Sequence, residues 1–449
     1  MDRIVLSALE EQLDAPTARG LAHAVSRAIR AGALTPGAQL PPIRTVATEL
    51  GLSPTTVSAA WGLLARSGTI RTDGRRGTTV AEPTRVGSPR YERALDRHAD
   101  FALDLSTGVP DAALLPDLTR ALGSIGVATA PGSYLDDPVL PELIETLRAD
   151  WPYDAEELTV VDGAMDGIEL ATRVLVRFGD RVVVEQPGFP PLLDLLEASG
   201  AEVVGVPVDE EGLAADGLRS ALADGPVVAV YLQPRAQNPT GVSLTPRRAK
   251  ELAAALRHSD AVVIEDDSAG AVAMAAPISL GSWLPGRTLH VRSFAKSHGP
   301  DLRMAALSGS SELVGRITAL RRLGQGWSSR LLQRLLLSLL TDPASAASVA
   351  AARAEYARRR AVLVAELAQA GVEVGGSDGI NLWLPVQDET AAVVRLASQG
   401  VGVTPGAPFA VLPDQPPHVR VTCGLLRDGQ AEVAATLAAA ARGTVRVSV

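Results

Sequence analysis

Two lysines stand against 40 arginines in this chain of 449 residues, and one of the two lies in a segment that could do covalent chemistry. Lys296 follows a short apolar stretch in VRSFAKSHGPDLRMAALSG (291–309), between Ser293 and Arg303. A lysine amine can form a Schiff base with an aldehyde, whereas a guanidinium cannot. We therefore predict a covalent role for Lys296 and interpret Lys250, which lies among charged residues, as a surface side chain.

Three further motifs supply groups that a phosphate-bearing aromatic aldehyde would need. VVDGAMDGIELA (160–171) predicts a strand, a glycine turn and a helix start, whose free N–H groups would face an anion. These N–H groups belong to Gly163, Ala164 and Met165. YLQPRAQNPTG (231–241) places an asparagine after a strand, and AVVIEDDS (261–268) places carboxylates at a strand end, where ligands bind in open α/β sheets. Each motif alone is also explained by a simple turn, a helix cap or a solvated loop.

Taken together, the four motifs fit pyridoxal 5′-phosphate (PLP). A lysine amine holds the aldehyde, and a carboxylate keeps the pyridine nitrogen protonated, so that the ring acts as an electron sink. An asparagine can donate to the phenolic oxygen. Serine, arginine and a helix N-terminus can hold the phosphate. The sequence therefore predicts PLP as the cofactor.

The elements that must position these residues alternate between strands and helices from about 102 to 340. Short apolar runs are predicted as strands at 158–162, 181–185, 201–206, 227–232, 261–266, 288–293 and 304–309. Helices are predicted between most of them, at about 165–178, 190–199, 214–223 and 246–258. This alternation predicts an α/β fold with a largely parallel sheet covered on both faces. A long helix near 343–370, followed by mixed short strands and helices, predicts a smaller C-terminal α+β part.

The first 80 residues predict a winged helix-turn-helix. Helical periodicity covers 17–31, 43–50 and 53–66, and the segment TIRTDGRRGTTVA is typical of a β-hairpin. Residues 19–80 hold eight arginines against Glu49 and Asp73, which leaves −15 on the rest of a chain whose net charge is −9. Only this basic module is expected to meet a polyanion such as double-stranded DNA.

The helix at 53–66 would enter the major groove and present its N-terminal residues to the bases or phosphates. Ser53 is predicted as its N-cap. The candidate DNA contacts are Arg44, Ser53, Thr55, Thr56 and Ser58 together with Arg75 and Arg76 of the wing. For each of these residues, a solvated surface role remains equally open.

Other kinds of site find no support in the composition. The single cysteine, Cys423, excludes a disulfide framework and a cysteine-based zinc site, and the six histidines show no metal-ligand spacing. No apolar run has membrane-spanning length, and the first residues lack the pattern of a signal peptide. We therefore expect a cytoplasmic protein with no metal and no membrane contact.

Two stretches of the chain resemble known families. Residues from about 104 to 449 resemble fold type I, aspartate aminotransferase-like PLP proteins, with the motifs in the same order. Residues 17–81 resemble GntR-type winged helices, notably in GALTPGAQLPPIRTVATELGLSPTTVSAAWGLLARSGTI. The chain is thus similar to the MocR subfamily of GntR regulators, which fuses the two. This implies a winged helix at 1–80, a linker at 81–103 and a PLP domain at 104–449, with a mostly parallel seven-stranded sheet and a small part after about 340.

The resemblance also implies a role for each residue of the cofactor site. Lys296 would form the Schiff base, Asp266 would pair with the pyridine nitrogen, and Asn238 would bind the phenolate oxygen. The residues implied to hold the phosphate are Ser293, Arg303 and the turn at Gly163, Ala164 and Met165.

Four further positions complete this implied site. Phe189 would lie close to the ring, and Tyr134 would reach the phosphate of a partner subunit. Arg420 would hold an α-carboxylate. Ser268 stands where the family usually has a tyrosine that hydrogen-bonds the phenolate, and Asn381 stands where relatives often have histidine. Ligand specificity is therefore expected to differ from that of the best-known members.

Three functions remain open from the sequence. The first is a homodimeric transcriptional regulator, whose PLP domain senses PLP itself or an amino compound through an aldimine at Lys296. The second is an active aminotransferase with a DNA-binding appendage, in which Lys296 would move the α-proton as a general base. The third is a body that has lost PLP and binds another ligand, which the retained Lys296 argues against.

Overall fold

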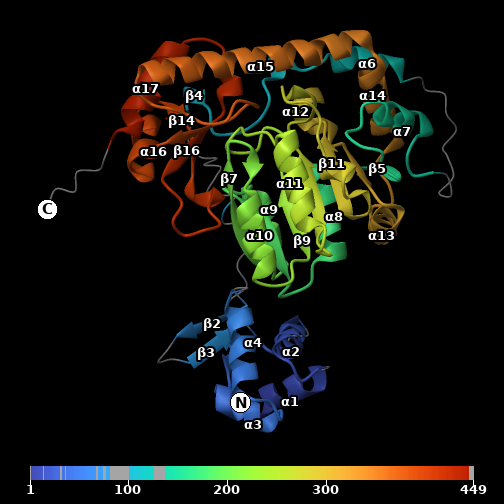
Figure 1. Ribbon diagram of the computed structural model, residues 1–449, viewed down its shortest axis with the longest axis vertical. Coiled ribbons are helices and arrows are strands. Elements are labelled where there is room, and N and C mark those ends of the chain that lie inside the picture. Colours follow the sequence, from blue (N-terminus) through green and yellow to red (C-terminus); the bar gives the residue numbers. More distant parts are fainter. Residues whose placement is uncertain are drawn as a thin grey trace.

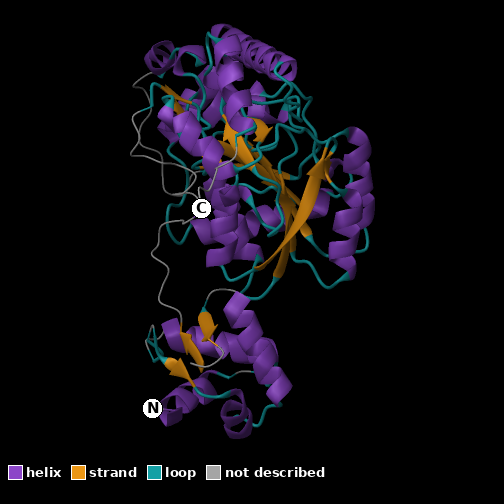
Figure 2. Ribbon diagram, turned by 90° about the vertical axis from the view of Figure 1, so that its left-hand side faces the viewer, coloured by secondary structure: helices purple, strands orange, loops and turns teal. Residues whose placement is uncertain are grey.

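The computed structural model describes residues 2–13, 15–30, 33–35, 37–66, 69–73, 77–80, 90, 101–125 and 137–443. A small N-terminal domain lies at one end of a larger α/β body, and a long helix runs along the far side of that body (Figure 1). Viewed from the side, the large sheet of the body is enclosed between helices (Figure 2).

In the described part of residues 2–80, helices pack against an antiparallel sheet of order β1-β3-β2. The elements are α1(Asp2–Gln12), α2(Ala18–Arg30), β1(Gln39–Leu40), α3(Ile43–Glu49), α4(Pro54–Arg66), β2(Ile70–Asp73) and β3(Gly77–Val80). The predicted apolar stripe of α4 is buried, since Val57, Ala60, Trp61 and Leu64 are at most 4% exposed. The three predicted helices and the hairpin are therefore present, and α1 adds a helix that the sequence analysis did not identify.

The body is organised around one large sheet of order β5-β12-β11-β10-β9-β6-β7-β8. Its strands are β5(Glu157–Val161), β6(Arg181–Gln186), β7(Glu202–Asp209), β8(Gly212–Leu213), β9(Ala229–Leu232), β10(Val262–Asp267), β11(Thr288–Ser293) and β12(Ala305–Gly309). Strand β12 runs antiparallel to both of its neighbours, whereas β11, β10, β9, β6 and β7 are parallel. All seven predicted strands are present, and the two-residue β8 adds an antiparallel edge.

Alternate side chains of these strands face opposite helical layers, as the period of a strand requires. Val182 and Val184 of β6 pack with α8(Ala164–Leu175), α9(Pro190–Ala198) and α13(Ser311–Arg321). Val183, between them, packs with α10(Ala215–Ala223) and α11(Pro246–Leu256). The near-continuous apolar strands thus reflect burial on both faces.

The remaining elements complete the body around this sheet. They are β4(Leu103–Asp104), α6(Leu118–Ser124), α7(Pro141–Arg148), α12(Ala295–His298), α14(Arg330–Thr341), α15(Pro343–Gln369), β13(Leu382–Pro385), α16(Glu389–Ser398), β14(Val401–Gly402), β15(Thr404–Pro405), β16(His418–Val421) and α17(Gln430–Ala441). The 3-10 helices are η1(Ala112–Leu114), η2(Gly270–Val272), η3(Leu280–Ser282), η4(Pro285–Arg287), η5(Pro300–Leu302), η6(Ala407–Phe409) and η7(Cys423–Leu425). The C-terminal part has its own sheet, of order β13-β16-β15, and its own core with α15, α16 and α17.

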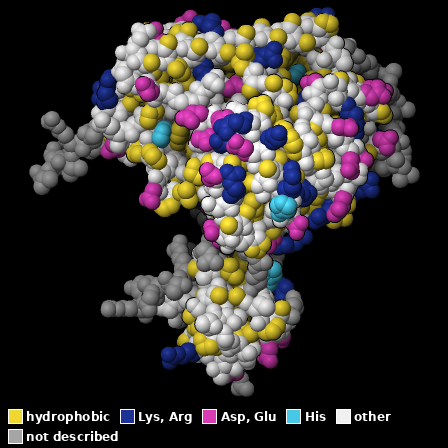
Figure 3. Space-filling model, viewed as in Figure 1, with side chains coloured by type: hydrophobic (Ala, Val, Ile, Leu, Met, Phe, Trp, Pro, Cys, Tyr) yellow, Lys and Arg dark blue, Asp and Glu magenta, His cyan; other side chains and the backbone are white. Residues whose placement is uncertain are grey.

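No single described helix is long and apolar enough to cross a membrane, although the bent pair α14 and α15 together passes a test of length and composition. On the face of the body seen in Figure 3, acidic and basic side chains are interspersed.

The N-terminal domain touches the body at the loop between α8 and β6. The His23 ring of α2 lies edge-on to Phe178 with ring centroids 5.9 Å apart, and His23 Nε2 is 3.2 Å from the Phe178 carbonyl oxygen. Phe178 also packs against the apolar core of the N-terminal domain. A body side chain therefore contributes to the packing of the DNA module.

A buried ionic junction joins the chain segment ahead of η1 to the C-terminal part. The Asp111 carboxylate accepts hydrogen bonds from Arg359 of α15 at 2.9 Å and from two nitrogens of Arg427 at 2.9 and 2.6 Å. Burial alone would raise the pKa of Asp111, but the hydrogen bonds from Arg427 and Arg359 lower it to about 2. The charged carboxylate thus holds three distant segments together.

We expect Asp111→Ala to lower the free energy of unfolding of the body by about 2–3 kcal/mol, because the buried Arg359 would lose one of its two carboxylate partners and keep only Glu355. The pKa of Asp111 is lower in the folded chain, so its contribution is present above the ordinary value of 3.8 and is lost as the pH falls toward 2. Urea denaturation at a series of pH values measures both effects. Asp216→Ala, which removes an exposed partner of Arg219, is the control and should change stability by about 0.5 kcal/mol or less. A deficit in Asp111→Ala that is equal at pH 7 and pH 3 would contradict the assignment.

Candidate cofactor site

The carboxyl ends of β9, β10 and β11 meet at one edge of the sheet and bring three predicted residues together. Asp266 lies on β10, Lys296 lies on α12 just after β11, and Asn238 follows β9. Lys296 Nζ donates to the Ser268 carbonyl oxygen at 3.3 Å. Lys296 and Asp266 are close enough that each charge shifts the pKa of the other. The motifs separated in sequence thus form one site.

The two adjacent aspartates of β10 have different surroundings. Asp267 accepts from Arg235 Nε and Nη2 at 3.1 and 2.5 Å, and burial would raise its pKa, but His290 and Arg235 hold that pKa well below the usual range. Asp266 Oδ2 accepts from Gln233 Nε2 at 2.6 Å, whereas Asp266 Oδ1 is buried and meets no hydrogen-bond donor among the described residues. Asp266 therefore keeps one oxygen for a ligand, and Asp267 does not.

This oxygen provides a test of whether the site fits PLP. A buried carboxylate oxygen without a donor is costly, and a protonated pyridine nitrogen supplies the missing N–H. Burial raises the pKa of Asp266 to about 6, against the opposing effects of the Gln233 hydrogen bond and the Lys296 charge. The carboxyl group is therefore mostly ionised at neutral pH and suited to such a donor.

The environment of Lys296 favours the neutral amine. Burial lowers the pKa of Lys296, the charge of Asp266 raises it, and the charge of Arg420 lowers it. A neutral amine is the nucleophilic form. These surroundings therefore suit attack on an aldehyde.

A compact turn lies at the N-terminus of α8. Gly163 precedes the helix with φ +107°, and a Cβ at this position would lie 2.8 Å from Arg303 Nη2. Arg303 Nη2 donates to the Asp162 carbonyl oxygen at 3.1 Å, and Ser293 Oγ accepts from the Ala295 amide at 3.2 Å. The structure thus places Arg303 against the glycine turn, where helix amides and a guanidinium suit an anion.

Two asparagine side chains, Asn238 and Asn381, approach each other at the site. Asn381, just before β13, directs its Nδ2 toward Asn238 Oδ1 at 3.5 Å, and Asn381 Oδ1 is buried without a hydrogen-bond partner in the described chain. This contact engages Asn238 Oδ1, so the side-chain Nδ2 of Asn238 is the group that could donate to a ligand oxygen.

Arg420 of β16 closes the site from the C-terminal part of the body. Its Nη2 donates to Thr404 Oγ1 at 2.9 Å and to the Ser106 carbonyl oxygen, and its guanidinium lies 5.4 Å from the Phe409 ring centroid. A Cβ on Gly108 would lie 3.3 Å from Arg420 Nη1. The guanidinium is therefore held in place by several neighbours, as the recognition of a planar carboxylate requires.

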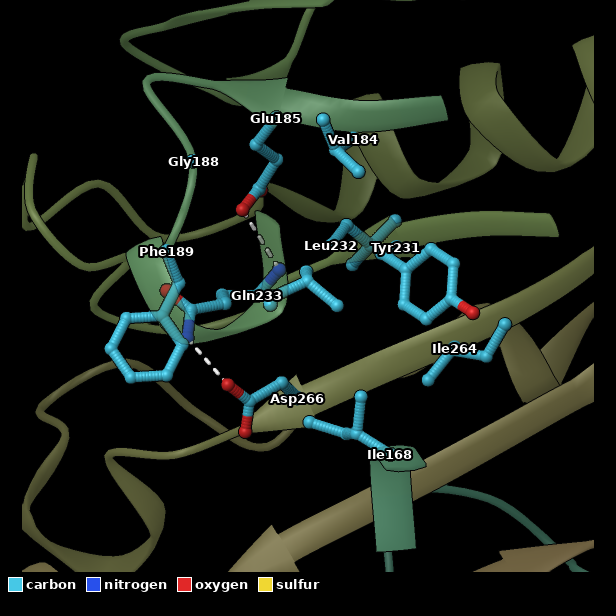
Figure 4. Close-up of a pocket in the computed structure, with 11 residues that line it drawn as sticks. Ile168, Val184, Glu185, Gly188, Phe189, Tyr231, Leu232, Gln233, Ile264 and Asp266 are labelled. Atoms are coloured by element: carbon cyan, nitrogen blue, oxygen red, sulfur yellow. Dashed lines mark hydrogen bonds between the residues drawn. The ribbon is translucent and has the colours of Figure 1, made fainter. Parts of the chain in front are cut away.

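Phe189 and Asp266 line the same pocket, which is drawn in Figure 4. Phe189 precedes α9, and apolar side chains of α8, β9 and β10 form the pocket floor. Gln233 lies between Glu185 and Asp266 in this view (Figure 4). The pocket is small, so it shows that Phe189 and the Asp266 carboxylate share one enclosed, mostly apolar corner of the site.

In the DNA module, four of the predicted contacts lie at the N-terminal end of α4, and Arg44 lies on α3. Ser53 Oγ accepts from the Thr56 amide at 3.0 Å, so Ser53 caps the helix as predicted. Ser53, Thr55, Ser58 and Arg44 are exposed and Thr56 is half-buried. Leu63, near the other end of α4, approaches Gly179 of the body. The candidate contacts on α4 therefore lie at the end of that helix away from the body.

Some residues named from the sequence cannot be placed, and others were missed. Arg75, Arg76 and Tyr134 lie outside the described residues. Gln233 and Thr404, which bind Asp266 and Arg420, were not identified as site residues. Gln233 could have been suspected, because it ends the strand of the same YLQPRAQNPTG motif that contains Asn238.

Because Arg420 lowers the pKa of Lys296, we expect Arg420→Gln to raise that pKa. Acetylation of the cofactor-free chain over a range of pH, quantified by peptide mass spectrometry, should show the Lys296 midpoint moving to higher pH. The exposed Lys250 is an internal control whose profile should not change. Coincident Lys296 profiles in both chains would show that Arg420 does not act on the amine.

Comparison with known proteins supports the division into two parts. Residues 102–437 match the family "Aminotransferase class I and II", and residues 17–80 match "Bacterial regulatory proteins, gntR family". The chain is 36% identical over 431 residues to the vitamin B6 salvage pathway transcriptional repressor PtsJ of Salmonella typhimurium, covering 93% of this chain and 96% of the relative. It is 30% identical to the HTH-type pyridoxine biosynthesis transcriptional regulator PdxR of Corynebacterium glutamicum, covering 86% of each chain.

Solved aminotransferase structures share the fold of the body. A kynurenine aminotransferase of Pyrococcus horikoshii matches with a TM-score of 0.70 at 21% identity, covering 76% of this chain and 91% of that structure. The α-aminoadipate aminotransferase LysN of Thermus thermophilus, complexed with N-(5′-phosphopyridoxyl)-L-leucine, matches with a TM-score of 0.68 at 21% identity, covering 79% and 95%. The chain therefore belongs to the MocR-type transcriptional regulators, in which a GntR-type DNA-binding domain is joined to a fold type I, aminotransferase-like body.

Proposed function

We propose that this transcriptional regulator binds PLP covalently through Lys296. Its affinity for DNA changes when the body binds the cofactor, or an amino compound that reacts with the cofactor. The observation that carries the proposal is the buried Asp266 Oδ1 without a donor, at the same sheet edge as a lysine of lowered pKa. When bound, PLP supplies an electron-withdrawing ring and an electrophilic aldehyde carbon.

In this proposal, different residues of the chain bind different parts of the cofactor. Asp266 accepts from the ring nitrogen, Asn238 donates to the phenolic oxygen, and Phe189 covers the ring. Arg303, Ser293 and the amides of the turn at Gly163, Ala164 and Met165 hold the phosphate. In this proposal Ser268 leaves the phenolic oxygen to Asn238, because a serine side chain is shorter than tyrosine.

The names of two relatives favour one class of effector molecule. PtsJ and PdxR are named for vitamin B6 salvage and pyridoxine biosynthesis, which favours PLP itself as the signal for this chain. Arg420 favours a carboxylate-bearing amino compound as the alternative, because its guanidinium faces Gly108 and is fixed by Thr404. Either ligand alters DNA binding only if it binds two arrangements of the chain with different affinity.

We propose that the partner of the N-terminal domain is double-stranded DNA in the cytoplasm, and that the chain acts as a homodimer. Two winged helices would then read paired half-sites. Tyr134 is proposed to reach the phosphate of the partner subunit.

An active aminotransferase remains the second candidate function. Lys296, Asp266, Asn238 and Arg420 are all present, and the structure brings the first three to one sheet edge. Production of a keto acid over many turnovers, with an amino acid and a keto acid supplied together, would favour catalysis over sensing.

Lys296→Ala should remove the covalent attachment. Incubated with PLP and desalted, the natural chain should show a visible absorption band that disappears on borohydride reduction and leaves one label at Lys296. The variant should show neither, because an alanine has no amine. Lys250→Ala is the matched control and should behave as the natural chain. A persistent band in Lys296→Ala, or a label at Lys250, would refute the assigned lysine.

Arg44→Ala tests the DNA face. We expect weaker binding to a mixed-sequence DNA duplex and a salt dependence that is shallower by about 1 in log–log slope for each subunit, because one phosphate contact is lost. Arg120→Ala, on α6 at the far end of the body, removes the same charge and should leave the slope unchanged. Equal slopes for the natural chain, Arg44→Ala and Arg120→Ala would show that Arg44 does not contact a DNA phosphate.

A further inference from the structure

One side chain that the assignment of roles leaves unused contacts three of the assigned residues. Gln233, just after β9, donates from Nε2 to Asp266 Oδ2 at 2.6 Å and to Ser268 Oγ at 3.2 Å. Its Oε1 accepts from the Asn238 amide at 2.7 Å. The carboxamide is thus bound on both its nitrogen and its oxygen side.

These hydrogen bonds determine how the Asp266 carboxylate is presented. Gln233 engages Oδ2, and Oδ1 is the oxygen left without a donor in the described chain. The same carboxamide accepts from the main-chain amide of Asn238, in the loop that follows β9. One neutral amide therefore sets the positions of both groups that would address the ring.

Gln233 is itself anchored from the opposite side. Its main-chain amide donates to Glu185 Oε2 at 3.1 Å, and Gln233 is 7% exposed (Figure 4). Burial raises the pKa of Glu185 to about 8, so this carboxyl group adds little negative charge beside Asp266 at neutral pH. The side-chain carboxamide of Gln233 thus has little freedom to turn away from Asp266.

We infer that Gln233 is a positioning residue, which orients and keeps ionised the Asp266 carboxylate so that its free oxygen meets the ring nitrogen of PLP. The inference rests on the proposed function. Gln233 acts through Asp266 and does not itself touch the cofactor. Loss of the carboxamide would leave both carboxylate oxygens without a donor and would favour the protonated carboxyl group.

The first test is the affinity for PLP, measured by the visible band. Gln233→Leu should weaken binding about tenfold, since a buried hydrogen bond to a charged group is lost. In an Asp266→Asn background, the same substitution should have little further effect, because the group through which Gln233 acts is gone. Gln430→Leu, which removes a glutamine carboxamide that donates to the Leu426 and Arg427 carbonyl oxygens beside α17, is the control and should bind normally.

Gln233→Glu supplies a readout that a purely structural role would not move. A glutamic acid can donate to Asp266 only while protonated, so the affinity should fall as the pH rises, more steeply than in the natural chain. The inference is overturned if Gln233→Leu binds as the natural chain does, or if its defect is undiminished in the Asp266→Asn background. A parallel pH dependence for Gln233→Glu and the natural chain would overturn it as well.

A second measurement needs no cofactor and separates this inference from the proposed function. Asp266 raises the pKa of Lys296, and the Gln233 hydrogen bond lowers that of Asp266. Gln233→Leu should therefore move the acetylation midpoint of Lys296 to lower pH, but not when Asp266→Asn is also present. A natural chain that never attaches PLP would refute the proposed function, whereas an unmoved Lys296 midpoint would refute the positioning role.

Discussion

The buried carboxylate of Asp266 is the constraint on which the rest of the site depends. A negative charge removed from water must be compensated by donors and opposite charges, or it takes up a proton. Here Gln233 donates to one oxygen and Lys296 contributes a nearby positive charge, yet the pKa of Asp266 still rises to about 6. The site is therefore incompletely compensated, and a cationic ring nitrogen would complete it.

The sheet explains why this carboxylate stands where it does. Neighbouring residues of a strand face opposite sides, so Asp266 and Asp267 are directed into different environments. Asp267 meets Arg235 and His290, whereas Asp266 faces the pocket beneath Phe189. A shift of β10 by one residue would exchange the two carboxylates and remove the free oxygen from the pocket.

Much of the fold could be predicted because local patterns determine it. Apolar runs of strand length, separated by helical periodicity, placed the parallel strands, and Ser53 marked the start of α4. The carboxyl ends of parallel strands share an edge, so Lys296, Asp266 and Asn238 could be expected to meet. The Ser53 cap was predictable from one helix start, whereas the DNA contacts assigned to the first turn of α4 stay a prediction.

The contacts that were missed join residues on different elements of the fold. Thr404 binds Arg420, and Asp111 binds Arg359 across 248 positions, although no local pattern distinguishes either residue. Gln233 is different, because a polar side chain at a strand end could have been noticed in the sequence. The sequence does not say whether Gln233 contacts Asp266 or Asp267, because that depends on the register of β10 against β9. Single-sequence patterns specify elements, whereas register and side-chain partners depend on the packed whole.

Helix α8 connects the two parts of the molecule in a way that the separate domains do not suggest. It begins at the Gly163 turn beside Arg303 and ends at Leu175, three residues before Phe178, which touches His23 of the DNA module. Twelve helical residues span about 18 Å, and its inward face is packed into the main core of the body. Close-packed helices move as units more readily than they deform. The Gly163 turn, where we propose that the phosphate binds, and the DNA module are therefore joined through a single packed helix, so a ligand that shifted this helix would also shift the surface that the winged helix contacts.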